Sequence, residues 1–205
     1  MLDPNVVPGW FTLEDMHVAR TLCMKLPKNA NVVEIGTFCG RSAATWAKEL
    51  PDATIYTIDI DLQWDAMEYL NEHHYHGDLK YYKGSPFETL HWVMGHYPNI
   101  ISVISNSTNV KMLNNIDLIF IDGGHEYDAV KADLQHWYPR LAPNGIICGH
   151  DYLIEFFPGL INAVDEFANQ NNLMVVTRLP SSMWILEKKN ILQLRSPNNR
   201  ISSGL

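Results

Sequence analysis

Residues 31–42, N-V-V-E-I-G-T-F-C-G-R-S, constrain the fold of this chain more than any other stretch. They begin with a short β-branched apolar run, V-V-E-I, that is typical of a buried strand. A loop with two glycines four positions apart, Gly36 and Gly40, follows, and residues 42–50 have a helical pattern. A parallel strand, a glycine turn and a helix start present backbone N–H groups and a positive dipole end to a ligand. The stretch therefore predicts an α/β fold with a ligand site at this turn.

The residues of the loop narrow the kind of ligand. A dinucleotide fingerprint needs a second glycine where this chain has Phe38, and the helix start G-R-S lacks the lysine of a phosphate-binding loop. Phosphate binding is therefore disfavoured. An acidic strand residue (Glu34), a glycine for close approach (Gly36) and a capping serine (Ser42) suit a cationic, zwitterionic ligand without phosphate. The alternative is a tight strand-to-helix turn that binds nothing.

Composition excludes several classes of function. The 205 residues fit one globular domain, and their formal net charge of −8 without any basic run argues against binding to nucleic acid or to an anionic membrane. The three cysteines are scattered and lack metal-type spacing, which favours reduced thiols in the cytoplasm. No leader or long apolar segment is present, so we expect a cytoplasmic protein. The sequence leaves the oligomeric state open, a homo-oligomer included.

A second strand is expected at 53–58, closing on Asp59. Before the first strand, Thr12 is expected to cap a helix whose inner face runs from Leu13 to Leu26. The compact strand–helix–strand unit implies parallel strands joined by a right-handed crossover. An acidic residue at the tip of the second strand commonly accepts hydrogen bonds from ribose hydroxyls, and this is the role we expect for Asp59. The alternative is an exposed strand-end aspartate.

Residues 60–99 form an insertion that is rich in aromatic and imidazole side chains. An insertion of this length in a compact fold usually has a function or is mobile, and we expect a cap over an acceptor pocket, with helices near 64–72 and 87–96. Its H-H-Y-H segment, 73–76, is expected to be a solvated turn rather than a metal site, because neighbouring histidines point apart.

The most specific motif follows the strand expected at 116–121 and reads D-G-G-H-E-Y from Asp122. After a helix and the turn P-N-G, a strand at 146–148 ends in G-H-D-Y. Consecutive strands of this kind commonly lie side by side, so Asp122 and Asp151 are expected to emerge together, with His125 facing the same crevice.

The remaining elements complete the expected fold. A strand at 100–104, a short helical link at 110–113, a helix from Pro158 and an edge hairpin of strands at 173–179 and 183–187 are expected. The prediction is an α/β, Rossmann-like, doubly wound sheet of seven strands, mostly parallel with an antiparallel last strand, with helices on both faces. One domain would span 1–187, and 188–205 would be a polar tail.

The E-x-G-x-x-x-G loop and the I-D-G-G-H-E-Y and G-H-D-Y motifs resemble those of class I S-adenosylmethionine-dependent methyltransferases. Within them the chain resembles the small O-methyltransferases of methyltransferase domain family 24, which include antibiotic-sugar O-methyltransferases. The resemblance covers residues 9–187 and implies an S-adenosylmethionine site. Its residues would be Glu34, Gly36, Thr37, Phe38, Gly40, Ser42, Asp59, Ile60, Asn106, Ser107 and Asp122.

The resemblance also implies a divalent metal at Asp122, His150 and Asp151. His150 departs from the acidic or amide residue that relatives have there, which disfavours Mg²⁺ and suits Mn²⁺ or a transition metal better.

Methyl transfer to a hydroxyl needs an aligned and activated acceptor oxygen. Either a metal lowers the hydroxyl pKa, or His125 or His150 removes the proton, with Asp122 beside them; the sequence does not choose between these. The expected acceptor is a small molecule, a sugar or a phenol. Two other interpretations compete: a nicotinamide-dependent oxidoreductase on a similar sheet, and a non-catalytic nucleoside-binding module.

Overall fold

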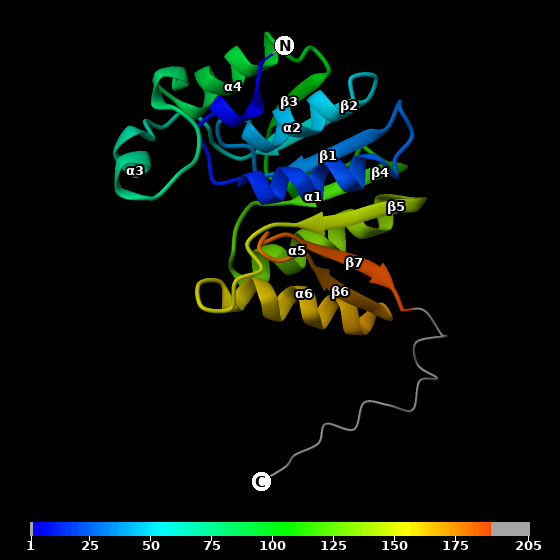
Figure 1. The fold of residues 1–205 in the computed structure, drawn as a ribbon. Coiled ribbons are helices and arrows are strands. Elements are labelled where there is room, and N and C mark those ends of the chain that lie inside the picture. Colours follow the sequence, from blue (N-terminus) through cyan, green and yellow to red (C-terminus); the bar gives the residue numbers. More distant parts are fainter. Residues whose placement is uncertain (1, 190–205) are drawn as a thin grey trace.

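The chain folds around one seven-stranded sheet in the order β3-β2-β1-β4-β5-β7-β6, seen in the computed structural model, which describes residues 2–189 (Figure 1). The strands are β1 (Asn31–Ile35), β2 (Thr54–Asp59), β3 (Ile100–Ile104), β4 (Ile116–Ile121), β5 (Leu141–Gly149), β6 (Leu173–Thr177) and β7 (Trp184–Lys188). All neighbours pair in parallel except β7, which is antiparallel to both β5 and β6. This confirms the predicted fold class.

Helices cover both faces of the sheet. They are α1 (Leu13–Cys23), α2 (Arg41–Glu49), α3 (Met67–Glu72), α4 (Pro86–Met94), α5 (Tyr127–Trp137) and α6 (Pro158–Gln170). Side chains alternate between faces along each strand, so Leu118 and Phe120 of β4 pack with α1 and α2, whereas Ile119 and Ile121 pack with α5 and α6. No helix among the described residues has the length and apolar character that crossing a bilayer requires.

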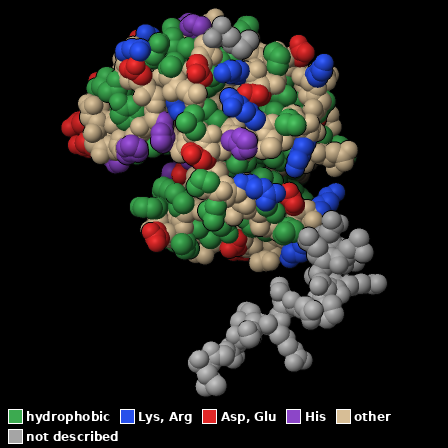
Figure 2. All heavy atoms as spheres, viewed as in Figure 1, with side chains coloured by type: hydrophobic (Ala, Val, Ile, Leu, Met, Phe, Trp, Pro, Cys, Tyr) green, Lys and Arg blue, Asp and Glu red, His purple; other side chains and the backbone are tan. Residues whose placement is uncertain are grey.

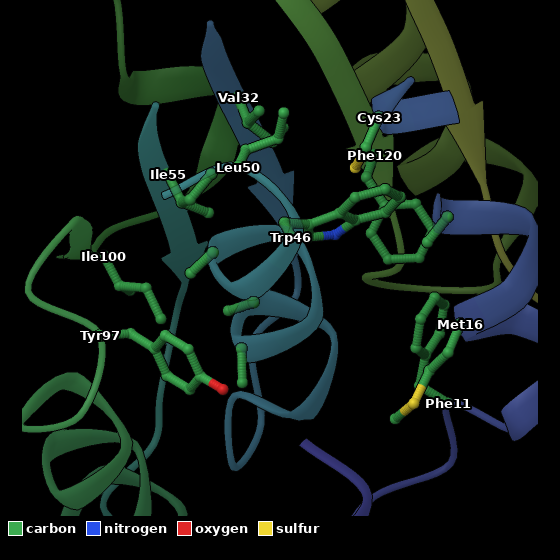
Figure 3. Packing of buried hydrophobic residues seen from close by; sticks show 14 of the residues in the cluster. Phe11, Met16, Cys23, Val32, Trp46, Leu50, Ile55, Tyr97, Ile100 and Phe120 are labelled. Carbon is green, nitrogen blue, oxygen red and sulfur yellow. The ribbon is translucent and has the colours of Figure 1, made fainter. Parts of the chain in front are cut away.

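Aromatic side chains form the centre of the α1–α2 face. Trp46 and Phe120 are fully buried with ring centroids 5.4 Å apart, and Phe11 contacts both of them (Figure 3). Burial of large apolar side chains of this kind is the dominant favourable contribution to folding. The core therefore ties the N-terminal segment to the centre of the sheet.

Several local predictions need correction. Helix α1 has the predicted Thr12 cap, which forms a capping box with Asp15, but it ends at Cys23, and Leu13 is 61% exposed rather than inward. Helix α2 begins at Arg41 with Gly40 at the N-cap position, so Ser42 is not its cap. The expected helical link at 110–113 is instead a 3₁₀ turn at Ser107–Asn109.

The expected turn at 143–145 lies inside strand β5. Leu141 pairs with Ile116 and Ile146 pairs with Leu118, so four residues of β5 form an irregularity opposite a single residue of β4. The cap over 60–99 contains α3 and α4 close to the expected ranges. The predicted polar tail lies outside the described residues from position 190 on.

Residues 2–11, here called the strap, lie across the cap and α2. The backbone of Gly9 exchanges two hydrogen bonds with His76 of the cap, at 3.1 and 2.8 Å. The buried guanidinium of Arg41 donates to four strap carbonyls, those of Pro4, Asn5, Val7 and Phe11. Arg41 is the first residue of α2, so one side chain joins the strap to the glycine loop that precedes this helix.

Candidate active site

A cleft of about 420 Å³ opens at the carboxyl ends of β1, β2, β3 and β4. Its walls come from residues 35–38, 58–60, 105–108 and 122–124, and from the first turns of α5. This edge is where open α/β sheets bind their ligands. The cleft therefore lies where the glycine loop predicted a ligand site.

The glycine loop passes very close to β4. Gly36 has a φ of +87°, and a Cβ there would lie 1.9 Å from the carbonyl oxygen of Asp122. Gly36 also donates its N–H to the Ile58 carbonyl at 2.8 Å. Only glycine accommodates both this φ and this approach, so the loop is fixed against β2 and β4.

Asp59 organises the loop from the tip of β2. One carboxylate oxygen accepts the N–H groups of Thr37 at 2.9 Å and Phe38 at 3.3 Å, and the other accepts that of Ile60 at 2.7 Å. All four residues line the cleft, as do Gly36, Asn106, Ser107 and Asp122. The structure thus brings eight of the eleven predicted cofactor residues to one cleft.

Glu34, Gly40 and Ser42 are the three that do not line this cleft. Glu34 is fully buried beneath the loop, where Thr57 donates a hydrogen bond to its carboxyl group at 2.9 Å. The Thr57 hydroxyl in turn contacts that of Thr37, 2.5 Å away. Burial raises the pKa of Glu34 to about 8. Glu34 therefore lies under the glycine loop and connects to it through Thr57 and Thr37.

Asp122, His125 and Asp151 lie close together, and of the three only Asp122 lines the cleft. Each offers one ligand atom, and these atoms all lie within 4.8 Å of one another. His125 Nε2 lies 2.9 Å from the Asp151 carboxylate, and that hydrogen bond raises the His125 pKa. Asp151 has a φ of +61°, a left-handed conformation that aspartate tolerates better than most residues. The predicted meeting of Asp122 and Asp151 is present.

His150 lies in a layer beneath these three groups. It is 4% exposed, with Nε2 2.9 Å from Asp15 and Nδ1 3.2 Å from Asp151 and 3.5 Å from Asp122. Burial alone would lower the His150 pKa, but the surrounding carboxylates raise it well above the ordinary value. Both ring nitrogens of His150 thus face carboxylates, which His150 orients, and His125 is the imidazole that forms a cluster of potential metal ligands with Asp122 and Asp151.

Asp15 is the site residue that the sequence did not indicate. Its fully buried carboxylate accepts hydrogen bonds from Thr12, Ser181 and the backbone N–H of Ser182, as well as from His150. Burial opposes its ionisation, but the His150 hydrogen bond holds the Asp15 pKa below the ordinary value. The T-x-x-D pattern of Thr12 and Asp15 predicts only a helix cap. The contact between Asp15 and His150 joins residues 135 positions apart, and no local sequence pattern indicates it.

The His73–His76 turn is only partly exposed: His73 and His74 are exposed, whereas Tyr75 and His76 are half-buried. Within residues 2–189, the only group of three or more potential metal ligands is Asp122, His125 and Asp151. His73 is exposed and stacks on Tyr69 with ring centroids 4.1 Å apart.

Comparison with known proteins identifies the domain. The model of methyltransferase domain family 24 matches residues 33–152, more than half of the chain. The uncharacterized protein y4gI of Sinorhizobium fredii is 28% identical over 129 residues, a match that covers 58% of this chain and only 13% of that protein's length.

Solved structures share the fold at low identity. A protein of Corynebacterium glutamicum has a TM-score of 0.63 at 15% identity, covering 87% of this chain and 82% of that chain. CalS11, a TDP-rhamnose 3'-O-methyltransferase of calicheamicin biosynthesis, has a TM-score of 0.59 at 15% sequence identity, and the match covers 85% of this chain and 77% of CalS11. The O-methyltransferase NovP has a TM-score of 0.57 at 16% sequence identity, and the match covers 87% of this chain and 81% of NovP. Sheet order, cleft and family match agree, and this chain belongs to methyltransferase domain family 24.

Proposed function

We propose that this protein transfers a methyl group from S-adenosylmethionine to a hydroxyl of a small molecule. The observation that carries the proposal is the cleft in which the 36–38 loop and Asp59 meet Asp122. A volume of about 420 Å³ lies in the range of small-ligand sites. The membership in a methyltransferase family supports the same chemistry.

Asp59, Ile60, Asn106 and Ser107 are the proposed nucleoside contacts. Asp59 accepts four backbone N–H groups, but those of Phe38 at 3.3 Å and Asp61 at 3.4 Å are long, so a ribose hydroxyl can compete for the same lone pairs. The Asn106 carbonyl oxygen accepts from Thr108 at 3.0 and 2.7 Å, which leaves its NH₂ group to face a ligand. The 36–38 loop and Asp122 would hold the methionine part of the cofactor.

His125 is the proposed base. An ionised Asp151 can only accept, so His125 donates through Nε2 and keeps a free lone pair on Nδ1. In the transfer, the acceptor oxygen forms a bond to the methyl carbon and the carbon–sulfur bond breaks. The electron pair of that bond remains on sulfur, and the hydroxyl proton passes to Nδ1 of His125. Asp151 stabilises the resulting imidazolium.

The same three groups fit a divalent cation. Two carboxylates and one imidazole within 4.8 Å form a mixed oxygen and nitrogen donor set, which suits Mn²⁺ or a transition metal better than Mg²⁺. Bound there by Asp122, His125 and Asp151, such an ion would lower the pKa of the acceptor hydroxyl. His150 and Asp15 would keep the two carboxylates oriented in either case.

Calorimetric titration with S-adenosylhomocysteine tests the proposal. We expect micromolar binding that is lost in Asp59→Ala and kept in Asp61→Ala, which alters an exposed acidic neighbour two positions on. Repeating the titration with excess chelator shows whether a metal contributes, and NADH serves as the control ligand for an oxidoreductase. If S-adenosylhomocysteine does not bind under any condition, the proposal is wrong.

The fold and the family match leave both a sugar and a phenol as candidate methyl acceptors. CalS11 is a TDP-rhamnose O-methyltransferase, and the shared fold makes a sugar hydroxyl one reasonable acceptor. A fold supports many acceptors, so the choice between the two classes must come from the side chains around the reactive end of the cleft.

A further inference from the structure

Four aromatic side chains form a continuous wall beside the cleft: Trp10, Phe38, Trp64 and Tyr69. Trp10 lies 4.9 Å from Phe38 and 5.4 Å from Tyr69 between ring centroids, and Trp64 lies 5.8 Å from Tyr69. Phe38 lines the cofactor cleft itself. The wall therefore begins where the cofactor would lie and continues over the strap and the cap.

The wall presents aromatic surface to solvent. Trp64 is 40% exposed and Tyr69 is 44% exposed, although both already contact other rings. Single exposed apolar residues are ordinary, but a contiguous aromatic group at the edge of a ligand cleft marks a binding surface.

The segment 153–156, here called the lip, begins two residues after Asp151. Leu153, Ile154 and Phe156 are exposed, and Phe156 also contacts Phe157. Phe157 in turn lies against the His125 ring, with centroids 4.1 Å apart. Figure 2 shows a notch between the lobe that carries α3 and the lobe that carries α6, with hydrophobic side chains gathered on its lower edge.

Among the described residues, the charged side chains that line the cleft are acidic. No lysine or arginine lines the cleft, whereas Asp59, Asp122 and Asp133 do. The two lysines of the cap are engaged elsewhere, Lys80 with Asp78 at 2.7 Å and Lys83 over the ring of Trp92. A diphosphate-bearing acceptor would need positive groups or helix N-termini to offset its charge. The lack of lysine and arginine among the described residues of the cleft lining therefore favours an uncharged acceptor.

We infer that the methyl acceptor is an uncharged aromatic alcohol, a phenol without phosphate, whose ring lies between the wall and the lip. This inference rests on the proposed methyltransferase function and selects one acceptor class for the same site. Trp64 and Tyr69 would determine specificity by stacking on the acceptor ring, and Trp10 would complete the surface. Arg41 fixes Trp10 indirectly, because it holds the strap carbonyls on both sides of that residue.

The test is calorimetric titration of 2-naphthol, a neutral bicyclic phenol, into the protein saturated with S-adenosylhomocysteine. Parallel titrations use methyl glucoside and TDP-glucose, and the bound cofactor product prevents the nucleotide from occupying the cofactor cleft. We expect 2-naphthol to bind and the other two not to bind. Tyr69→Ala should weaken binding of 2-naphthol roughly tenfold, and Tyr69→Phe should restore it. Tyr81→Ala removes a cap aromatic that stacks on Trp92 away from the wall, and it should change nothing.

Tighter binding of TDP-glucose or methyl glucoside than of 2-naphthol would overturn the inference. Binding of 2-naphthol that Tyr69→Ala leaves unchanged would overturn it as well, because the wall would then have no part in recognition. If S-adenosylhomocysteine binds and 2-naphthol does not, the acceptor class alone is wrong. If S-adenosylhomocysteine itself fails to bind, the proposed function and the acceptor class both fall.

Discussion

Replacing Glu34 by glutamine should change how the stability of this protein depends on pH. Glu34 is fully buried in β1, and one of its two carboxyl oxygens has no hydrogen-bond partner among the described residues. Burial raises its pKa from 4.5 to about 8, so the folded protein keeps a proton that the unfolded chain releases. Glutamine has nearly the same shape and does not ionise. The variant therefore removes this proton-linked contribution and little else.

The magnitude follows from the two pKa values. A group whose pKa is higher in the folded protein than in the unfolded chain contributes fully to the unfolding free energy below its unfolded-state pKa. That contribution is lost as the pH rises to the folded-state pKa. For Glu34 the loss begins near pH 4.5 and continues to about pH 8 at about 1.4 kcal/mol per pH unit. Relative to the glutamine variant, the wild-type protein should lose about 3 kcal/mol of unfolding free energy by pH 7 and about 5 kcal/mol above pH 8.

Urea unfolding at a series of pH values from 5 to 9 measures this difference. The slope of the difference with pH is the informative quantity, because a buried amide adds an offset that does not vary with pH. Contributions from titrating groups that do not interact with Glu34 are present in both proteins and cancel, whereas Asp122, whose charge helps to raise the Glu34 pKa, is part of the measured difference. Glu155→Gln, at an exposed position, is the matched control and should follow the wild type at every pH. A difference between wild type and Glu34→Gln that stays flat across the series would refute the reasoning.

Two further substitutions test the buried polar network and the strap. Asp15→Asn removes one of the three carboxylates around the buried His150 imidazolium, so the unfolding free energy should fall by about 3 kcal/mol, the lower end of the cost of breaking a buried pair. The loss of unfolding free energy should be largest between about pH 4 and 6.5, where Asp15 and His150 both contribute fully to wild-type stability. An NMR titration should show a lower His150 pKa in the variant. An unchanged His150 pKa would contradict this account. Arg41→Met removes four hydrogen bonds from a buried guanidinium and should cost about 3 kcal/mol or more, with faster proteolysis within residues 2–11. Arg41→Lys should recover only part of this, because an ammonium does not reproduce the planar fork, and a lysine variant as stable as wild type would contradict the assigned role.

The strands show how far local pattern carries a fold prediction. The run 100–104 predicts β3 with the bounds that the structure has, because four of its five residues are isoleucine or valine and polar residues flank them. In β5, by contrast, the residues P-N-G read locally as a turn, yet pairing with β4 draws them into an irregular part of the strand. Tertiary pairing outweighs local turn propensity at this point.

The site residues that could be predicted from the sequence are those that lie at the ends of strands. Asp59, Asp122 and Asp151 follow predicted strands, and parallel strands bring such residues to one edge. The location of Glu34 was not predictable, because the sequence does not show which face of β1 its side chain occupies or what covers that face. The Asp15–His150 pair lies further from prediction, since its two members come together only when α1, β5 and the 181–182 segment pack.

The position of β7 determines when during synthesis the buried hydrogen bonds of Asp15 can form. Strand β7 is the last of the sheet in the chain but lies between β5 and β6, to which it is antiparallel (Figure 1). A nascent chain that has emerged as far as Thr177 contains both outer partners and lacks the strand between them. Ser181 and Ser182, which hydrogen-bond to Asp15, emerge only just before β7. The ribosome must therefore release nearly the whole described chain before β6 joins the sheet and before Ser181 and Ser182 hold Asp15 in place, whereas the residues that line the cleft emerge earlier.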